Sequence, residues 1–245
     1  MPYKRIISLV PSLTELLFDF GLENEIVGRT RFCIHPSDQV SRVQIIGGTK
    51  NPNIGKIIEL QPDLVIANKE ENRKEDIDAI SQFCEVIVTE IDTVKSAFNW
   101  IHKIGVKLNR TYESELLIDQ IIKFVATSNS HPIKTAYFIW KEPWMSVGND
   151  TYIHDVMKLF GLENVFGDKT RYPETSLMEL IDLNPELILL SSEPYPFKKK
   201  HVQLLTESLP SSRIMLIDGE WFSWYGSRMV HSFKELKTWR NSLSI

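Results

Sequence analysis

The chain has 245 residues, 42% of them hydrophobic and 24% charged, which is typical of a folded globular protein and excludes a disordered or fibrous one. Its 28 Lys and Arg nearly balance its 32 Asp and Glu, and this argues against a general nucleic-acid-binding protein, which carries a basic surplus. With only two cysteines, Cys33 and Cys84, a disulfide scaffold is also excluded.

Strands and helices alternate through the first part of the chain. Strands are predicted at residues 5–10, 26–28, 64–67 and 85–88, and helices at residues 12–20, 54–60 and 76–83. Continuous apolar runs such as Leu64–Ala67 are typical of strands that are buried on both faces. The alternation therefore predicts a parallel sheet with helical crossovers.

Two helices are predicted after the last of these strands. One helix is predicted from Thr93 to His102 and a second from Thr111 to Asn129. In the second helix, apolar residues recur with the spacing of one helix face, and no Pro or Gly interrupts them. We expect this segment to be a rigid rod that limits the opening of a cleft between two lobes.

The second half of the chain repeats the first. Residues 57–66, IIELQPDLVI, match residues 180–189, LIDLNPELIL, and the sequence FGLEN occurs at both 20–24 and 160–164. The pairs are offset by 123 and 140 residues, so the first lobe carries 17 more residues within segment 25–56. The expected fold class is α/β, with two αβ lobes containing parallel sheets and bridged by a single long α-helix. The predicted boundaries are 1–103 for the N-terminal lobe, 104–130 for the bridge and 131–245 for the C-terminal lobe.

Aromatic residues are concentrated in the second lobe, which holds 16 of the 25. Ligands of parallel sheets sit beyond the carboxyl ends of the strands, and many of these rings follow predicted strands. We expect about half of them to face a ligand that is large and partly apolar. The candidate ligand-binding residues are Phe32, Cys33, His35, Trp140, Trp144, Trp221, Phe222, Tyr225 and Arg228.

Cys33 and His35 leave other functions open. An extended chain would place both side chains on one face, where they could contact a metal or work as a thiolate–imidazole pair. Metal sites usually need three or four ligands, so no metal site is assigned. No catalytic residue is assigned either. The alternatives are a cytoplasmic metal-chelate enzyme or chaperone that uses Cys33 and His35, and a receptor for a bare metal ion.

Four segments together resemble a known family. RIISLVPSLTELLFDFGL, IIELQPDLVIANKE, WMSVGNDTYIHDVMKLFGLENVF and LMELIDLNPELILLSS are similar to segments of the helical-backbone substrate-binding proteins of ABC importers. These are the cobalamin and iron–siderophore type, with the class III periplasmic-binding-protein fold. The resemblance covers residues 4–240. It implies a non-enzymatic protein that captures a metal chelate in the inter-lobe cleft, with cobalamin or another corrinoid favoured and a ferric siderophore or haem next.

The resemblance also implies roles for particular residues. His35 stands before Pro36 where the cobalamin-binding branch has a Tyr-Pro pair, Trp140 and Trp144 resemble its aromatic after the first strand of the second lobe, and Glu220-Trp221-Phe222 resembles its Asp-Trp-Phe segment. An Arg that follows that segment resembles Arg228. Family members dock on a permease through one acidic residue in each lobe. Glu15 matches the first, whereas Met178 stands at the second, with Glu174 and Glu179 nearby.

The N-terminus shows no uninterrupted apolar stretch of a secretion signal, and no segment reaches the roughly 18–20 apolar residues of a membrane span. We therefore expect a cytoplasmic protein from the sequence as given, and a periplasmic one if a signal was removed. The expected protein is a monomer with no intrinsic cofactor and no nucleic-acid partner. Its expected partners are a small-molecule metal chelate and an ABC permease.

Overall fold

The computed structural model describes residues 3–125 and 131–243, which form two compact units. Unit 1 contains the described residues up to Ile91, residues 95–120 and the short segment Tyr225–Arg228. Unit 2 contains Asp92–Val94, Ile121–Trp224 and the residues from Met229 onward, apart from those not described. The segment Tyr225–Arg228 thus belongs to unit 1 although it lies late in the chain.

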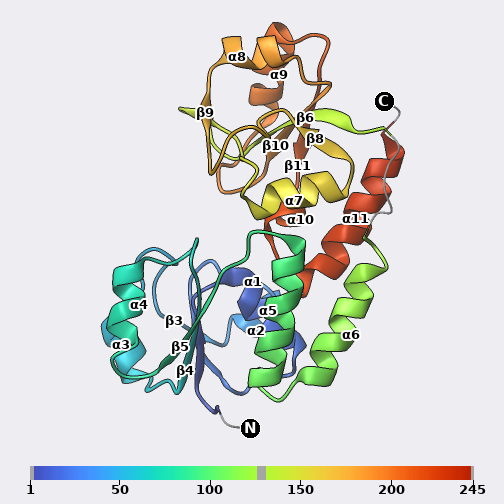
Figure 1. The fold of residues 1–245 in the computed structure, drawn as a ribbon. Helices are drawn as coiled ribbons and strands as arrows, with labels where there is room; N and C mark the ends of the chain where they lie inside the picture. Colours follow the sequence, from blue (N-terminus) through green and yellow to red (C-terminus); the bar gives the residue numbers. More distant parts are fainter. Residues whose placement is uncertain (1–2, 126–130, 244–245) are drawn as a thin grey trace. The chain divides into compact units, whose positions relative to one another are not determined.

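Unit 1 is built on a parallel sheet with the strand order β3-β2-β1-β4-β5. The strands are β1 (Ile6–Ser8), β2 (Ile26–Arg29), β3 (Gln44–Ile45), β4 (Leu64–Asn68) and β5 (Glu85–Thr89). Every residue of β1 and β4 is buried, because these two strands lie inside the sheet with helices over both faces. Helices α3 (Ile54–Glu59) and α4 (Lys74–Ile80) cover one face, and α1 (Pro11–Asp19) and α5 (Val94–Lys107) cover the other (Figure 1).

Unit 2 has a four-stranded parallel sheet with the order β11-β10-β6-β8. Its strands are β6 (Ile133–Phe138), β8 (Leu162–Asn164), β10 (Leu187–Ser191) and β11 (Arg213–Ile217), and its helices are α7 (Tyr152–Leu159), α8 (Leu177–Leu183), α9 (Lys199–Ser208), α10 (Glu220–Ser223) and α11 (Arg228–Ser242). A small antiparallel pair joins β7 (Trp144–Met145) to β9 (Glu174–Thr175).

The predicted internal repeat is visible in the strand orders. The order β2-β1-β4-β5 in unit 1 corresponds to β8-β6-β10-β11 in unit 2, with the same parallel pairing throughout. The matched sequences occupy equivalent places, because each runs through a helix, a Pro-containing turn and the following central strand. The α/β fold class with parallel sheets in two lobes is confirmed.

The helices after the first sheet differ from the prediction. The first, α5, runs to Lys107, five residues beyond the expected end at His102, and a turn at residues 108–110 separates it from α6 (Thr111–Ile122). The predicted continuous helix to Asn129 is therefore too long, since turns follow Ile122, and residues 126–130 of that prediction lie outside the described residues. The chain passes from unit 1 to unit 2 between Gln120 and Ile121, at the end of α6.

Candidate functional site

The loop after β2 in unit 1 has a rigid base and an apolar tip. The Arg29 guanidinium is buried and donates hydrogen bonds to the carbonyl oxygens of Val40 (2.7 Å), Cys33 (3.0 Å) and Thr30 (3.2 Å). Arg29 thereby ties the two ends of the loop together. At the tip the Phe32 side chain is 53% exposed. Among the predicted ligand contacts of unit 1, Phe32 is the one most accessible to a partner.

Cys33 lies beneath this tip and is fully buried. Its Sγ atom is 3.0 Å from Thr14 Oγ1 and 3.2 Å from Thr30 Oγ1. Burial raises the pKa of the Cys33 thiol above its ordinary value, so the thiol stays protonated. A nucleophile or metal ligand needs an accessible thiolate, and this geometry instead makes Cys33 part of the support of the loop.

His35 is half-buried and precedes Pro36 through a cis peptide bond. Within residues 3–125 and 131–243, His, Cys, Asp and Glu side chains form no group of three or more that could hold a metal ion. Among the described residues no such group includes His35, which interacts electrostatically with Glu15.

Glu15 and Arg228, for which the family resemblance implies two different roles, form an ion pair within unit 1. Arg228 Nε donates to Glu15 Oε2 at 2.9 Å, and a terminal guanidinium nitrogen donates to Oε1 at 2.6 Å. The two side chains are 13% and 15% exposed. Burial raises the pKa of Glu15, although Arg228 acts in the opposite direction. The pair attaches the segment Tyr225–Arg228 to α1.

In unit 2, five rings form a continuous series that we call the aromatic ladder, composed of Trp140, Tyr195, Phe197, Trp144 and Phe138. Successive ring centroids are 5.5, 4.8, 5.8 and 5.2 Å apart, which are contact distances for aromatic pairs. Phe138 is fully buried in the core, whereas Trp140 is 40% exposed. The ladder therefore connects the core of unit 2 to rings at its surface, beyond the ends of β6 and β10.

His201 supports the ladder from α9. Its Nδ1 accepts a hydrogen bond from the Lys198 backbone N–H at 2.9 Å, which leaves Nε2 facing the Tyr195 hydroxyl at 3.5 Å. Burial, together with Lys200, Lys141 and Lys198, lowers the pKa of His201. The neutral imidazole holds Tyr195 against the ladder by ring contact, with centroids 5.6 Å apart.

The predicted rings after β11 occupy different environments. Trp221 is half-buried on α10. Phe222, another predicted ligand contact, has a fully buried side chain that packs against Tyr137 with centroids 4.9 Å apart, and its contact with a ligand stays a prediction. Phe222 is therefore a core residue that anchors α10. Tyr225 is also buried, in the segment that belongs to unit 1.

The three acidic residues proposed for permease docking differ in accessibility. Glu15 is engaged by Arg228 as described above. Glu179 is paired with Lys169 and accepts a hydrogen bond from Thr175 Oγ1 at 2.7 Å. Glu174 is exposed in β9, and Met178 beside it is 76% exposed on α8. Glu174 thus offers the most accessible carboxylate of the three.

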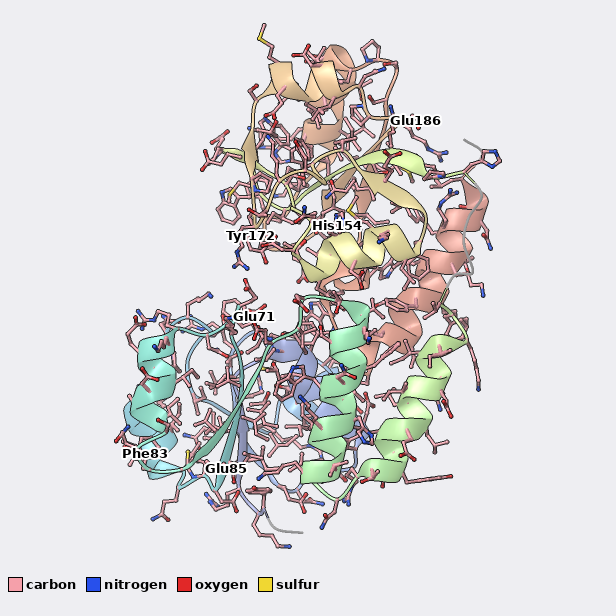
Figure 2. All side chains as sticks on the ribbon, viewed as in Figure 1. Glu71, Phe83, Glu85, His154, Tyr172 and Glu186 are labelled. Carbon is pink, nitrogen blue, oxygen red and sulfur yellow. The ribbon has the colours of Figure 1, made fainter. Side chains whose placement is uncertain are left out.

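The structure adds one candidate ligand-binding residue that was not among those predicted to follow the strands. Tyr172 lies on the loop between β8 and α8, which is the topological counterpart of the Phe32–His35 loop between β2 and α3. Figure 2 shows Tyr172 at the periphery of unit 2, and the neighbouring Arg171 lies 5.5 Å from its ring centroid. The internal repeat could have indicated this residue, because Tyr172-Pro173 follows β8 as His35-Pro36 follows β2, the corresponding strand of unit 1.

Among the described residues, no helix is both long enough and apolar enough to cross a membrane.

Comparison with known proteins gives consistent matches over most of the chain. The family model described as periplasmic binding protein matches residues 6–208. A Bacillus subtilis (strain 168) protein named "Uncharacterized ABC transporter substrate-binding lipoprotein YvrC" is 26% identical over 95% of this chain and 78% of its own length. A "Vitamin B12-binding protein" of Vibrio parahaemolyticus is 23% identical over 96% of this chain and 88% of its own length.

A solved structure supports the same fold. The "Periplasmic heme-binding protein RhuT from Roseiflexus sp. RS-1 in apo form" superposes with a TM-score of 0.84 at 18% sequence identity, covering 97% of each chain.

Proposed function

Because the chain belongs to the periplasmic binding protein family, we propose that it is a substrate-binding protein that captures a metal chelate. A cobalamin or another corrinoid is favoured, and haem or a ferric siderophore comes next. Relatives named for vitamin B12 and for heme bind such compounds. The observation that carries the proposal is the aromatic ladder, which presents Trp140 to a ligand on a series of rings anchored in the core.

The chemistry of the exposed residues suits this class of ligand. A large ring system is held by stacking and by burial of apolar surface, which stabilises a complex by about 25 cal/mol per Å². Phe32 in unit 1 and Trp140, Trp221 and Tyr172 in unit 2 offer such surface. The Arg29 guanidinium, which could otherwise pair with an anionic siderophore, is buried and donates to backbone carbonyl oxygens. The described residues thus favour a ligand recognised by its flat face over one recognised by its negative charge.

Two further points belong to the proposal. We propose that the protein works outside the cytoplasmic membrane, because the family model that matches it is described as periplasmic binding protein. An ABC permease would receive the ligand, and Glu174 is the acidic residue best placed to contact it. Charge reversal of Glu174 in β9 should then reduce transport while leaving ligand affinity unchanged.

Titration of cyanocobalamin, cobinamide, haemin and a ferric siderophore, followed by tryptophan fluorescence, tests the proposal directly. We expect saturable quenching by a corrinoid or by haemin. Trp140→Ala should weaken the binding by about tenfold or more, because an exposed ring that stacks on a ligand contributes on the order of 1–2 kcal/mol.

Trp100→Phe is the matched control. Trp100 lies on α5 in unit 1, where its Nε1 donates to the Glu90 carbonyl oxygen at 2.8 Å. This variant also removes one indole, and its affinity should equal that of the wild type. Absence of quenching by all four compounds would contradict the proposed function.

A further inference from the structure

In unit 2, polar hydrogen bonds join the loop after β10 to the segment after β11. Glu193 Oε1 accepts hydrogen bonds from Ser223 Oγ at 2.7 Å and from Trp224 Nε1 at 2.8 Å. Ser192 Oγ accepts a third from the Gly219 backbone N–H at 2.9 Å. The bond to Gly219 holds the start of α10, and the bonds from Ser223 and Trp224 hold its end. Helix α10 carries Trp221.

The two segments approach so closely that only glycine fits at their contact. A Cβ atom at Gly219 would lie 2.5 Å from Glu193 Cγ and 2.5 Å from Ser191 Oγ. Ser191 Oγ in turn accepts from the buried Tyr137 hydroxyl at 3.1 Å and donates to the Glu193 carbonyl oxygen at 2.6 Å. Glu193 is therefore held by the core of unit 2 on its backbone side, while its carboxylate holds α10.

The donors that reach Glu193 Oε1 carry no charge. Placing a half-buried carboxylate among uncharged donors costs free energy of folding, because the ionised form loses part of its solvation by water. Burial, together with Glu220 and Asp218, indeed raises the pKa of Glu193. What these two hydrogen bonds contribute is the orientation of the Trp224 indole, since both converge on a single oxygen atom and fix its direction.

We propose that Glu193 is a positioning residue for ligand binding, which holds Ser223 and Trp224 and thereby sets the orientation of α10 and of Trp221. This inference rests on the proposed function for the role of Trp221, whereas the positioning of α10 is a property of the ligand-free protein. Because both bonds end on Oε1, the amide oxygen of glutamine can replace it. Alanine removes the acceptor that the two donors share, and Ser223 Oγ then retains the Gly219 carbonyl oxygen at 2.9 Å.

The first experiment uses the full chain without ligand. Hydrogen–deuterium exchange of residues 219–225 should be about tenfold faster in Glu193→Ala than in the wild type, as expected for the loss of hydrogen bonds worth roughly 1.4 kcal/mol. In Glu193→Gln the exchange should stay within about threefold. The ultraviolet resonance Raman band that reports indole N–H hydrogen bonding should shift in Glu193→Ala and be retained in Glu193→Gln.

Glu207→Ala is the control, because Glu207 is exposed on α9 and the substitution makes the same chemical change. If Glu193→Ala does not fold, Ser223→Ala and Trp224→Phe remove the two donors one at a time while keeping the carboxylate. Unchanged exchange of residues 219–225 in Glu193→Ala, or in both donor variants, overturns the positioning role.

The second experiment measures affinity for cyanocobalamin and haemin. Whichever probe the wild type binds should bind Glu193→Ala about tenfold more weakly and Glu193→Gln within about threefold. Equal affinity of the wild type and Glu193→Ala overturns the link to the ligand. If the wild type binds neither probe, the proposed function fails, and the exchange and Raman results still decide whether Glu193 positions α10.

Discussion

Glu15 and Arg228 show how a residue's role depends on a partner that is distant in sequence. The two are separated by 213 positions, and the resemblance assigns one to a permease and the other to a ligand. Charge alone could not pair them, because the chain contains 28 basic and 32 acidic residues. Only the packing of the segment Tyr225–Arg228 against α1 brings them together.

The ion pair leads to a prediction about stability. Glu15→Ala should lower the free energy of unfolding by about 3 kcal/mol, because it removes the carboxylate that accepts two hydrogen bonds from Arg228 where water is largely excluded. Urea denaturation measures the difference. Glu113→Ala, which removes an exposed carboxylate 3.8 Å from Arg110 in the same unit, should change stability by less than about 0.5 kcal/mol. Equal effects of the two variants would show that the Glu15 pair is not structural.

Cys33 gives a second prediction at the residue scale. Its buried thiol should be alkylated by iodoacetamide at pH 8 only after the protein unfolds in urea, because both the raised pKa and the loss of access oppose reaction. Cys84 is half-buried and serves as an internal control that should react first. Peptide mass spectrometry distinguishes the sites. Rapid labelling of native Cys33 would restore the alternative of a working thiol.

Among the elements, strands within apolar runs were predictable, and several strands of two or three residues outside such runs were not. The central strands β4 and β10 are apolar throughout apart from a terminal polar residue, so their burial on two faces is evident in the sequence. Strands β3, β7, β8 and β9 have two or three residues each and show no periodicity. They form because a neighbouring strand provides backbone N–H and C=O groups for hydrogen bonding, and the local sequence does not show which strand will be the neighbour.

Helix ends were equally difficult. Nothing in residues 123–125 breaks a helix by Pro or Gly, yet α6 ends at Ile122. Likewise, the four-residue helix α10 follows a strand directly and is too short for an apolar pattern to reveal it. Tertiary packing therefore decided these boundaries, as is common where propensity is weak.

Gly219 provides a test at the scale of elements. Gly219→Ala should destabilise the protein by about 2 kcal/mol, because its Cβ would overlap Glu193 and Ser191 and push α10 away from the loop after β10. Thermal or urea denaturation measures the change. Gly55→Ala is the matched control, since its Cβ meets only Asn53 Oδ1 at 3.4 Å and α3 should gain about 0.5 kcal/mol. A neutral Gly219→Ala would mean that the contact relaxes freely.

For the whole molecule, buried acidic hydroxyl and thiol groups predict a loss of stability at alkaline pH. Burial raises the pKa of Cys33 in unit 1 and of Tyr137 and Tyr152 in unit 2. In the unfolded chain these groups ionise at their ordinary values, near 9 for Cys and 10 for Tyr, while the folded protein keeps them protonated. Above those values the unfolded state binds fewer protons, so the free energy of unfolding falls as pH rises.

Each such group should lower the free energy of unfolding by roughly 1.4 kcal/mol per pH unit once its unfolded form is ionised. Urea denaturation between pH 8 and pH 11 measures the slope. Tyr137→Phe should make the slope shallower, whereas Tyr112→Phe should leave it unchanged because Tyr112 is largely exposed on α6. An identical slope in the wild type and Tyr137→Phe would contradict the argument.

The late position of Arg228 has a consequence for the order of events during synthesis. Unit 1 includes residues that the ribosome adds only after nearly all of unit 2 has been made. More than two hundred residues are therefore added after Glu15 before Arg228, which forms the ion pair with it, has been synthesised. Unit 1 thus completes its folding only after most of unit 2 has been made, although most of the chain of unit 1 comes first. A chain truncated before Tyr225 would leave both units incomplete, because it lacks Tyr225–Arg228 of unit 1 and nearly all of α11 of unit 2.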